Sequence, residues 1–311
     1  MTEVLTTVVQ VASIWLVATL LSSLLTSLFY SVLRRLVGRF DVFTRAWSTL
    51  FLALSAPLVG LSAVLIYFFP AGAQLFVIPH CHAAACDIHA PLFSASSLGS
   101  IGLFVVTSLI LGACLIGIAG MLRAARRRLS TLFLLARQVP SPGYMVVESE
   151  QLFAWCCGLL RHEVVVSRAL LKRLDAAQLQ VVLAHEQAHA TRFDNLRKLL
   201  ARLATTFWLP AQRRRLVDDV AADCEACCHA QVAKQLADPA QLADVLAIVS
   251  PQPVHEQIST RSVEPSMLTP AGVHTRPVFA YLLLAGLAST QMIAVAAASH
   301  PLVEVLAALG G

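Results

Sequence analysis

The sequence predicts a mainly α-helical, polytopic membrane protein with four transmembrane helices and one cytoplasmic α+β domain. Three observations predict this class: a low share of charged residues, four long apolar runs, and the confinement of all basic residues to two segments. Of the 311 residues, 57% are hydrophobic and 13% are charged, whereas charged residues make up about a quarter of a typical soluble domain. Much of the chain is therefore expected to lie in the lipid bilayer.

Four apolar runs are each long enough to cross a hydrocarbon core, which requires about 20 helical residues. A buried core helix would explain one such run, but four in one chain favour membrane spans. The first run follows Glu3 and precedes Arg34 and Arg35, which is the reverse of a cleaved signal peptide. It is therefore expected to remain as an anchor. The four runs are Val4–Leu33, Trp47–Phe69, Gly99–Leu122 and Pro277–Ser299.

The basic residues orient the chain in the membrane. All 23 Lys and Arg residues lie either between Arg34 and Arg45 or between Arg123 and Arg276. Cytoplasmic loops retain positive charge, so both segments are predicted to be cytoplasmic, in a bacterial inner membrane with both termini outside. The formal charge of +5 then reflects charges close to the membrane surface, and it requires no direct nucleic-acid partner.

This topology divides the chain into a membrane region, a cytoplasmic domain and a returning span. The composition shifts to Pro, Ser, Thr and Glu after the cytoplasmic domain, which is typical of a flexible connector. The expected segments are residues 1–122 with three spans and an outer loop at 70–98, the cytoplasmic domain at 123–250, the connector at 251–276, the fourth transmembrane helix at 277–299 and a short outer tail at 300–311.

The outer loop carries five side chains that could bind a metal ion within ten residues. Cys81 and Cys86 lie in a predicted oxidising compartment, where two cysteines five residues apart favour a disulfide bond. The same sulfurs, with the neighbouring imidazoles, could instead bind copper or zinc. The histidines of this loop are His80, His82 and His89.

Three short strands are predicted early in the cytoplasmic domain. Tyr144–Val147 follows a Pro-Ser-Pro-Gly turn, and Phe153–Cys157 and Glu163–Ser167 have strand composition. A small sheet just before the next helix would offer an edge to which an extended peptide could add by main-chain hydrogen bonds. A sheet that only supports the domain explains the same pattern.

The helix that follows contains a His-Glu-x-x-His motif. Asp175 is expected to cap the helix, with Gln178 completing a capping box. Residues four apart share one helix face, so His185 and His189 can direct two imidazoles at one ion. Glu186 then lies where it can reach a water molecule on a bound Zn²⁺ ion and act as a general base.

A catalytic zinc site needs a third protein ligand. Glu225, on a predicted helix after Pro210, is the natural candidate, and His229 shares its face while Asp223 competes as an alternative. The cysteines Cys224, Cys227 and Cys228 could form a separate metal or redox site, although cysteines on a helix facing a core usually behave as small hydrophobic residues. The intervening amphipathic segment Leu196–Leu209 is expected to pack on the domain core or to lie at the inner membrane surface.

These features resemble the BlaR/MecR-type integral-membrane metallopeptidases. The resemblance is carried by the three N-terminal spans, the late fourth span, Gly158–Arg161, the His-Glu-x-x-His motif with Asp194, and Asp223–Cys228. It implies that His185, His189 and Glu225 bind zinc and that Glu186 is the general acid/base. Two departures stand out: His229 replaces a supporting Asp, and no penicillin-binding sensor domain follows the last span.

Three functions remain open from the sequence. The first is a signal-transducing zinc endopeptidase that cleaves a cytoplasmic protein such as a transcriptional repressor, and that could also cleave itself. The second is a membrane quality-control peptidase of the HtpX type. The third is a non-catalytic metal or redox receptor that uses the outer-loop histidines and the inner cysteines. Each function is compatible with a homo-oligomer in the lipid bilayer.

Overall fold

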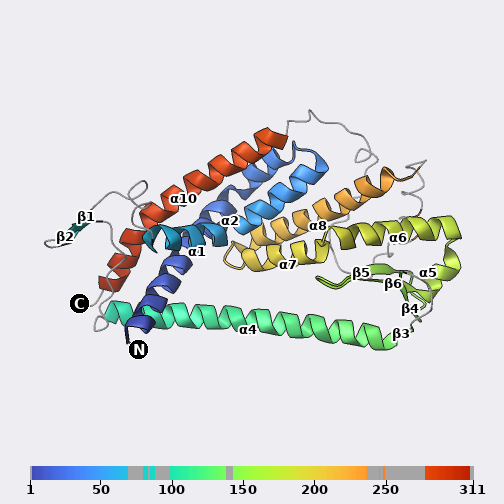
Figure 1. Ribbon diagram of the computed structural model, residues 1–311, viewed down its shortest axis with the longest axis horizontal. Helices are drawn as coiled ribbons and strands as arrows, with labels where there is room; N and C mark the ends of the chain where they lie inside the picture. Colours follow the sequence, from blue (N-terminus) through green and yellow to red (C-terminus); the bar gives the residue numbers. More distant parts are fainter. Residues whose placement is uncertain are drawn as a thin grey trace.

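The computed structural model describes residues 2–68, 80–82, 85–87, 98–137, 143–236, 245, 248 and 277–308. Four long helices form its membrane-type part: α1 (Thr2–Val37), α2 (Val42–Phe68), α4 (Leu98–Leu135) and α10 (Pro277–Ala308). In Figure 1, α1, α2 and α10 run together as one bundle. Helices α7 and α8, given below, lie against that bundle.

Three of these helices are long and apolar enough to cross a membrane. The apolar stretches are Gln10–Val37, Val42–Ile66 and Ile101–Arg127, which correspond to the first three predicted spans. In α10 the apolar stretch found among the described residues is shorter, Leu284–Val295. The fourth span therefore stays a prediction. The helix also continues to Ala308, so part of the expected outer tail is helical, because the apolar residues after His300 extend the same helix.

Helices α1, α2 and α10 contact one another closely through small and polar residues. A Cβ atom on Gly60 of α2 would collide with the Thr19 side chain of α1, so only glycine allows this approach. Gln291 of α10 donates hydrogen bonds to the Ser22 carbonyl and, over 2.7 Å, to the Thr26 hydroxyl of α1. Such polar contacts join helices where water is scarce.

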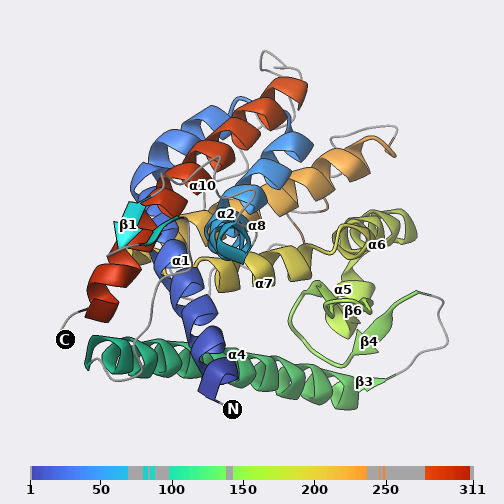
Figure 2. The same cartoon turned by 60° about the vertical axis from the view of Figure 1, so that its left-hand side comes forward.

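Helix α4 contacts α1 and α10 but is otherwise exposed. Figure 2 shows it running along one side of the molecule and ending at β3. Only 6% of its most apolar window is buried within the chain. Its apolar side chains therefore face outward, as expected for a lipid-exposed span.

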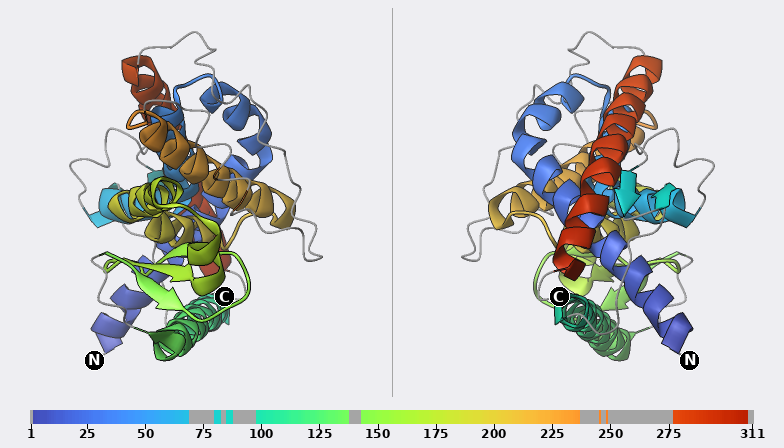
Figure 3. Two further views of the ribbon diagram at one scale, coloured as in Figure 1. Left: turned by 90° about the vertical axis from the view of Figure 1, so that its right-hand side faces the viewer. Right: turned by 90° about the vertical axis from the view of Figure 1, so that its left-hand side faces the viewer.

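The sheet has four strands in the order β3-β4-β6-β5. Strands β4 (Met145–Val147), β5 (Ala154–Cys157) and β6 (Glu163–Ser167) coincide with the three predicted strands, and β3 (Ala136–Arg137) adds an edge. Strand β4 pairs parallel with β6, and the other two pairs are antiparallel. Figures 1 and 3 show the sheet between α6 and the end of α4, with β5 at the edge nearer α6.

Four helices follow the sheet in the segment between α4 and α10: α5 (Arg168–Arg173), α6 (Ala176–Thr191), α7 (Asp194–Ala204) and α8 (Pro210–Ala233). Helix α7 is shorter than the predicted Leu196–Leu209 and begins earlier. It ends at Ala204, and the Ala201 carbonyl in its last turn accepts both the backbone N–H and the hydroxyl of Thr205. Pro210 then begins α8, because proline fits the first position of a helix.

Two hydrophobic cores place α8 between the membrane helices and the sheet. One joins the C-terminal part of α1 and the N-terminal part of α2 to α7 and α8, and includes Tyr30, Trp208 and Leu216. The other joins the sheet to α6 and α8, and includes Val166 and Leu170. The amphipathic face of α7 thus packs into a core that the domain shares with α1 and α2, as the first of the two expectations for this segment predicted; its position relative to the membrane surface stays a prediction.

In the outer loop the structure describes only two short strands, β1 (His80–His82) and β2 (Ala85–Asp87). They pair antiparallel, with Cys81 opposite Cys86. His89 and the side chains of these strands lie outside the described residues. The choice between a disulfide bond and a metal site in this loop therefore stays a prediction.

Candidate metal centre

Helix α6 presents the His-Glu-x-x-His motif at its C-terminal end. The predicted capping box begins the helix: the Asp175 carboxylate accepts the Gln178 backbone N–H over 2.8 Å, and the Gln178 side chain accepts the Asp175 N–H over 3.0 Å. The helix ends at Thr191. Phe193 then takes a left-handed conformation (φ 55°), which turns the chain sharply and places Asp194 beside the motif.

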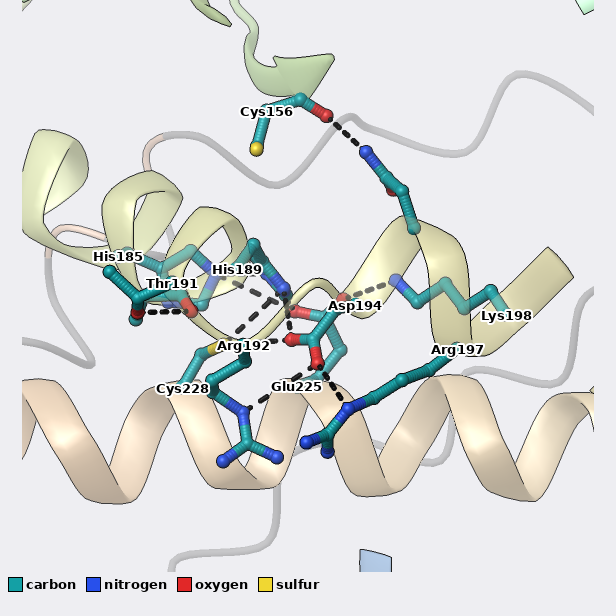
Figure 4. A network of polar contacts seen from close by, with 12 residues as sticks. Cys156, His185, His189, Thr191, Arg192, Asp194, Arg197, Lys198, Glu225 and Cys228 are labelled. Atoms are coloured by element: carbon teal, nitrogen blue, oxygen red, sulfur yellow. Dashed lines mark hydrogen bonds and ion pairs between the residues drawn. The ribbon is translucent and has the colours of Figure 1, made fainter. Parts of the chain in front are cut away.

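The imidazoles of the motif meet the Glu225 carboxylate of α8 at one point. The His185 and His189 Nε2 atoms are 3.2 Å apart. Glu225 Oε2 lies 3.5 Å from His185 Nε2 and 3.2 Å from His189 Nε2. Figure 4 shows these side chains converging from α6 and α8. The structure thus brings together the three predicted zinc ligands, although Glu225 is 36 residues from His189 and 40 residues from His185 in the sequence.

This triangle of atoms has the dimensions of a zinc site. Zinc–nitrogen and zinc–oxygen bonds are about 2.0–2.1 Å long, so two ligands of a tetrahedral ion are separated by about 3.3 Å. The three measured separations lie within 0.2 Å of that value. Two nitrogens and one oxygen leave a fourth tetrahedral position open, as in catalytic sites. The donor set therefore fits Zn²⁺.

Asp194 orients His189 for this role. Its side chain is fully buried and accepts a hydrogen bond from His189 Nδ1 over 2.9 Å, as Figure 4 shows. When a metal ion replaces the proton on Nε2, this bond would keep the other proton of His189 on Nδ1 and leave the Nε2 lone pair for the ion. Burial alone would lower the pKa of His189, but its hydrogen bonds to Asp194, Cys228 and Glu225 raise that pKa to about 12. The same anionic surroundings would stabilise a bound cation.

Two arginines surround the other oxygen of Asp194. The Nε atoms of Arg192 and Arg197 lie 3.6 and 4.0 Å from Oδ1. Burial raises the pKa of Asp194, but the bond to His189 and the nearby Arg192 charge outweigh it, so the pKa lies below its usual value. The carboxylate is therefore ionised when it holds the histidine.

Glu186 lies beside the triangle and is nearly buried. Burial raises the pKa of Glu186, against the opposing effect of the two histidines and of a hydrogen bond from the Cys156 backbone. That bond joins the metal-site helix to the edge strand β5. The glutamate is thus fixed next to the ligands by a strand rather than by another ligand.

Glu225 is held from a second direction by Lys198 of α7. The ammonium nitrogen lies 3.3 Å from Oε1, the oxygen that does not face the histidines. Burial raises the pKa of Glu225, but the hydrogen bonds to His185 and His189 and the Lys198 charge hold it well below its usual range. Each carboxylate oxygen of Glu225 therefore faces positive charge or a donor.

His229 lies next to His185, with ring centroids 5.2 Å apart. Its ligand atom and those of His185 and Glu225 all lie within 4.8 Å of one another. Burial lowers the pKa of His229 to about 4, with a further contribution from His185, so its ring is neutral near pH 7. Among the residues that the structure describes, the buried His185 Nδ1 has no hydrogen-bond partner.

Asp223 lies away from the metal centre, which corrects the expectation that it is an alternative or supporting group there. On α8 it is two residues before Glu225, so it projects from the opposite face of the helix. Both of its carboxylate oxygens accept hydrogen bonds from Arg34 of α1 and from Arg45 and Thr49 of α2.

The inner cysteines are mainly buried packing groups. Cys224, Cys227 and Cys228 are at most 2% exposed and free, in agreement with the packing interpretation. Cys228 has an additional contact, because its sulfur lies 3.3 Å from both His189 Nδ1 and Asp194 Oδ2.

Several residues at the site were not predicted from the sequence. Asn195 donates hydrogen bonds to the Cys156 and Gly158 carbonyls over 2.9 and 3.0 Å, and so attaches the end of β5 to the start of α7. Arg197 and Lys198 lie off the apolar stripe of the amphipathic segment Leu196–Leu209. Helix α7 meets α2 and α8, and no local pattern could show it.

The fold and the site together fit a membrane-type metallopeptidase. Two imidazoles and a distant carboxylate converge next to a glutamate, in a chain with three helices that are long and apolar enough to cross a membrane.

Residues 123–247 match the model of peptidase family M48. The matched segment holds the sheet, the motif helix and Glu225, and the match supports a metallopeptidase. Comparison with curated proteins gave no match, and comparison with solved structures gave none either.

Proposed function

We propose that this protein is a zinc-dependent endopeptidase of the bacterial inner membrane that cleaves a cytoplasmic protein. The observation that carries the proposal is the triangle of His185 Nε2, His189 Nε2 and Glu225 Oε2, with separations of 3.2 to 3.5 Å. When bound there, zinc would lower the pKa of a water molecule and polarise the carbonyl of the scissile peptide bond.

The protein's own residues would then move the proton. Glu186 accepts a proton from the attacking water and returns it to the amine that leaves. Its hydrogen bond from the Cys156 backbone keeps the carboxylate beside the ligands while the peptide is cleaved. Asp194 holds the His189 proton on Nδ1 throughout, so that Nε2 remains free to act as a ligand.

Strand β5 offers a place for an extended substrate. The Phe153 carbonyl accepts a hydrogen bond from the Ser167 N–H of β6. Because alternate residues of a strand bond to the same neighbour, the N–H and C=O groups of Ala154 and Cys156 face away from β6, at the edge of the sheet. The Cys156 N–H donates to the Glu186 carboxylate, and the Cys156 carbonyl accepts from the Asn195 side chain. A peptide would therefore pair with the edge at Ala154 and pass from there to the metal centre.

Glu186→Gln tests the assignment of the general base. The amide keeps the shape of the side chain and can still accept the Cys156 hydrogen bond, but it cannot take a proton. We expect the variant to keep one zinc ion per chain and to lose cleavage by about 10²–10⁴-fold. Glu225→Ala, in contrast, should lose both zinc and cleavage. An unchanged cleavage rate in Glu186→Gln would overturn the mechanism.

The substrate distinguishes a signalling peptidase from a quality-control peptidase. We propose the signalling role, with a transcriptional repressor as the substrate. Glu186→Gln carrying a photo-crosslinker in place of Trp155 on β5 should capture what binds at the site. One defined cytoplasmic protein supports signalling, and a wide range of misfolded membrane proteins supports quality control instead.

A further inference from the structure

A cluster of six polar side chains joins the membrane helices to α8. We name it the hairpin clamp, and Asp223 is its centre. Arg34 of α1 binds Asp223 through two hydrogen bonds of 2.7 and 2.9 Å. Arg45 and Thr49 of α2 add bonds of 2.8 and 2.7 Å. The remaining members, Tyr30 and Asp219, are joined by a 2.6 Å hydrogen bond.

The hairpin clamp differs from an ordinary surface ion pair. Asp223 is only 2% exposed, and its two oxygens accept four hydrogen bonds from residues 174 to 189 positions away in sequence. A buried charge is costly unless it is paired and fully hydrogen-bonded. This carboxylate is fully bonded only when α1, α2 and α8 are all in place.

The clamp acts on the helix that carries the third metal ligand. Asp223 and Glu225 are two residues apart on α8, so they project from opposite faces. One face of α8 packs on the α1–α2 hairpin, and the other packs on α6 and α7. The distance from Glu225 to the two imidazoles therefore depends on where the hairpin holds α8. A ligand set tolerates displacements of only about 0.5 Å.

The same hairpin also supports the histidine side of the site. The guanidinium carbon of Arg197 lies over the Trp47 ring of α2, 4.2 Å from the ring centroid. The guanidinium carbon of Arg192 lies over the Phe43 ring, 5.5 Å from that ring's centroid. These two arginines flank Asp194, which orients His189. The cytoplasmic end of α2 thus contacts the supports of ligands on both α6 and α8.

We propose that Asp223, held by Arg34 and Arg45, is a positioning residue for Glu225, so that the metal centre is complete only while the α1–α2 hairpin holds α8. This inference rests on the proposed zinc site but not on cleavage. It assigns the membrane hairpin a part in forming the site, beyond anchoring the chain.

The test is a double-mutant cycle on the full-length protein in detergent or nanodiscs. Asp223→Asn, Glu225→Ala and the double variant are stripped of metal, and their affinity for Zn²⁺ is measured by competition with a chromophoric chelator. We expect Asp223→Asn to weaken binding at least tenfold, because Glu225 is displaced. In the double variant, Asp223→Asn should add little to the loss from Glu225→Ala, since the ligand through which it acts is gone.

Two further measurements separate positioning from general destabilisation. The visible absorption bands of bound Co²⁺ should change in Asp223→Asn, because the ligand geometry changes, whereas they should stay as in the wild type in Asp218→Asn, an exposed substitution on the same helix. Where Asp223→Asn does not fold, Arg45→Lys replaces it, since lysine keeps the charge but not the geometry of the guanidinium.

An unchanged Zn²⁺ affinity in Asp223→Asn overturns the proposal. So does a full, additive loss on top of Glu225→Ala, because that result would show a defect that does not pass through the ligand. Both readouts are independent of cleavage. A protein that binds zinc with this coupling but cuts nothing would refute the peptidase function and leave the positioning role standing.

Discussion

The substitution Asp194→Asn isolates the contribution of a buried carboxylate to the metal centre. Asparagine keeps the size of the side chain and one acceptor oxygen for His189 Nδ1, but it removes the negative charge. In the structure that charge lies 2.9 Å from the imidazole and is fully buried. Partners of this kind are worth about 10–100-fold in metal affinity. We therefore expect the Zn²⁺ dissociation constant to rise by that factor, which corresponds to about 1.4–2.7 kcal/mol.

The assay is chelator competition on metal-free, full-length protein, with Asp218→Asn as the matched control. Asp218 is an acidic residue exposed on α8, so its loss should leave the dissociation constant unchanged. The melting temperature without metal is measured in parallel, because Arg192 and Arg197 lose their shared partner in Asp194→Asn. If the variant binds zinc as tightly as the wild type, the inference that Asp194 fixes the orientation of His189 fails.

Three other predictions concern the elements around the site. Asp175→Ala should destabilise α6 by about 1 kcal/mol, since it removes the cap, and equal melting temperatures would contradict this. Gly158→Ala should cost about 1–3 kcal/mol, because φ is +96° there and a Cβ atom would collide with the Arg161 carbonyl; a fully stable variant would show that the turn has another conformation. Burial raises the pKa of Cys156 to about 11, so the neutral thiol persists far above pH 8. Its alkylation rate, measured by mass spectrometry, should rise with pH until about 11 in folded protein, and a plateau near pH 9 would exclude this.

The sequence predicted the elements whose signals are local. The capping box at Asp175 and Gln178 and the strand at Glu163–Ser167 appear as expected, because a cap and a short β-branched run depend on neighbouring residues. The spacing of His185 and His189 likewise determined that they share a face. For Glu225 the sequence offered only residue type and a plausible helix, and the structure places its carboxylate against both imidazoles.

The contacts that cross the chain could not be predicted. Arg34 and Arg45 carried a topological signal in the sequence, as positive charges on the cytoplasmic side. Their bonds to Asp223 join residues 178 and 189 positions apart, and no periodicity encodes such a partner. The contact of Lys198 with Glu225 could not be predicted for a similar reason, because the pattern of a helix does not show which neighbour covers its polar side.

The hydrogen bond between Glu186 and the Cys156 backbone affects how inactive forms of this protein should be chosen. In the proposed mechanism this carboxylate handles the proton, and it also accepts a hydrogen bond from the edge strand. Truncation to alanine would remove that contact between the motif helix and β5 as well as proton transfer, so a failure to trap a substrate would have two explanations. Glutamine retains the contact, so complexes captured with it would report on the site as it exists in the wild-type protein.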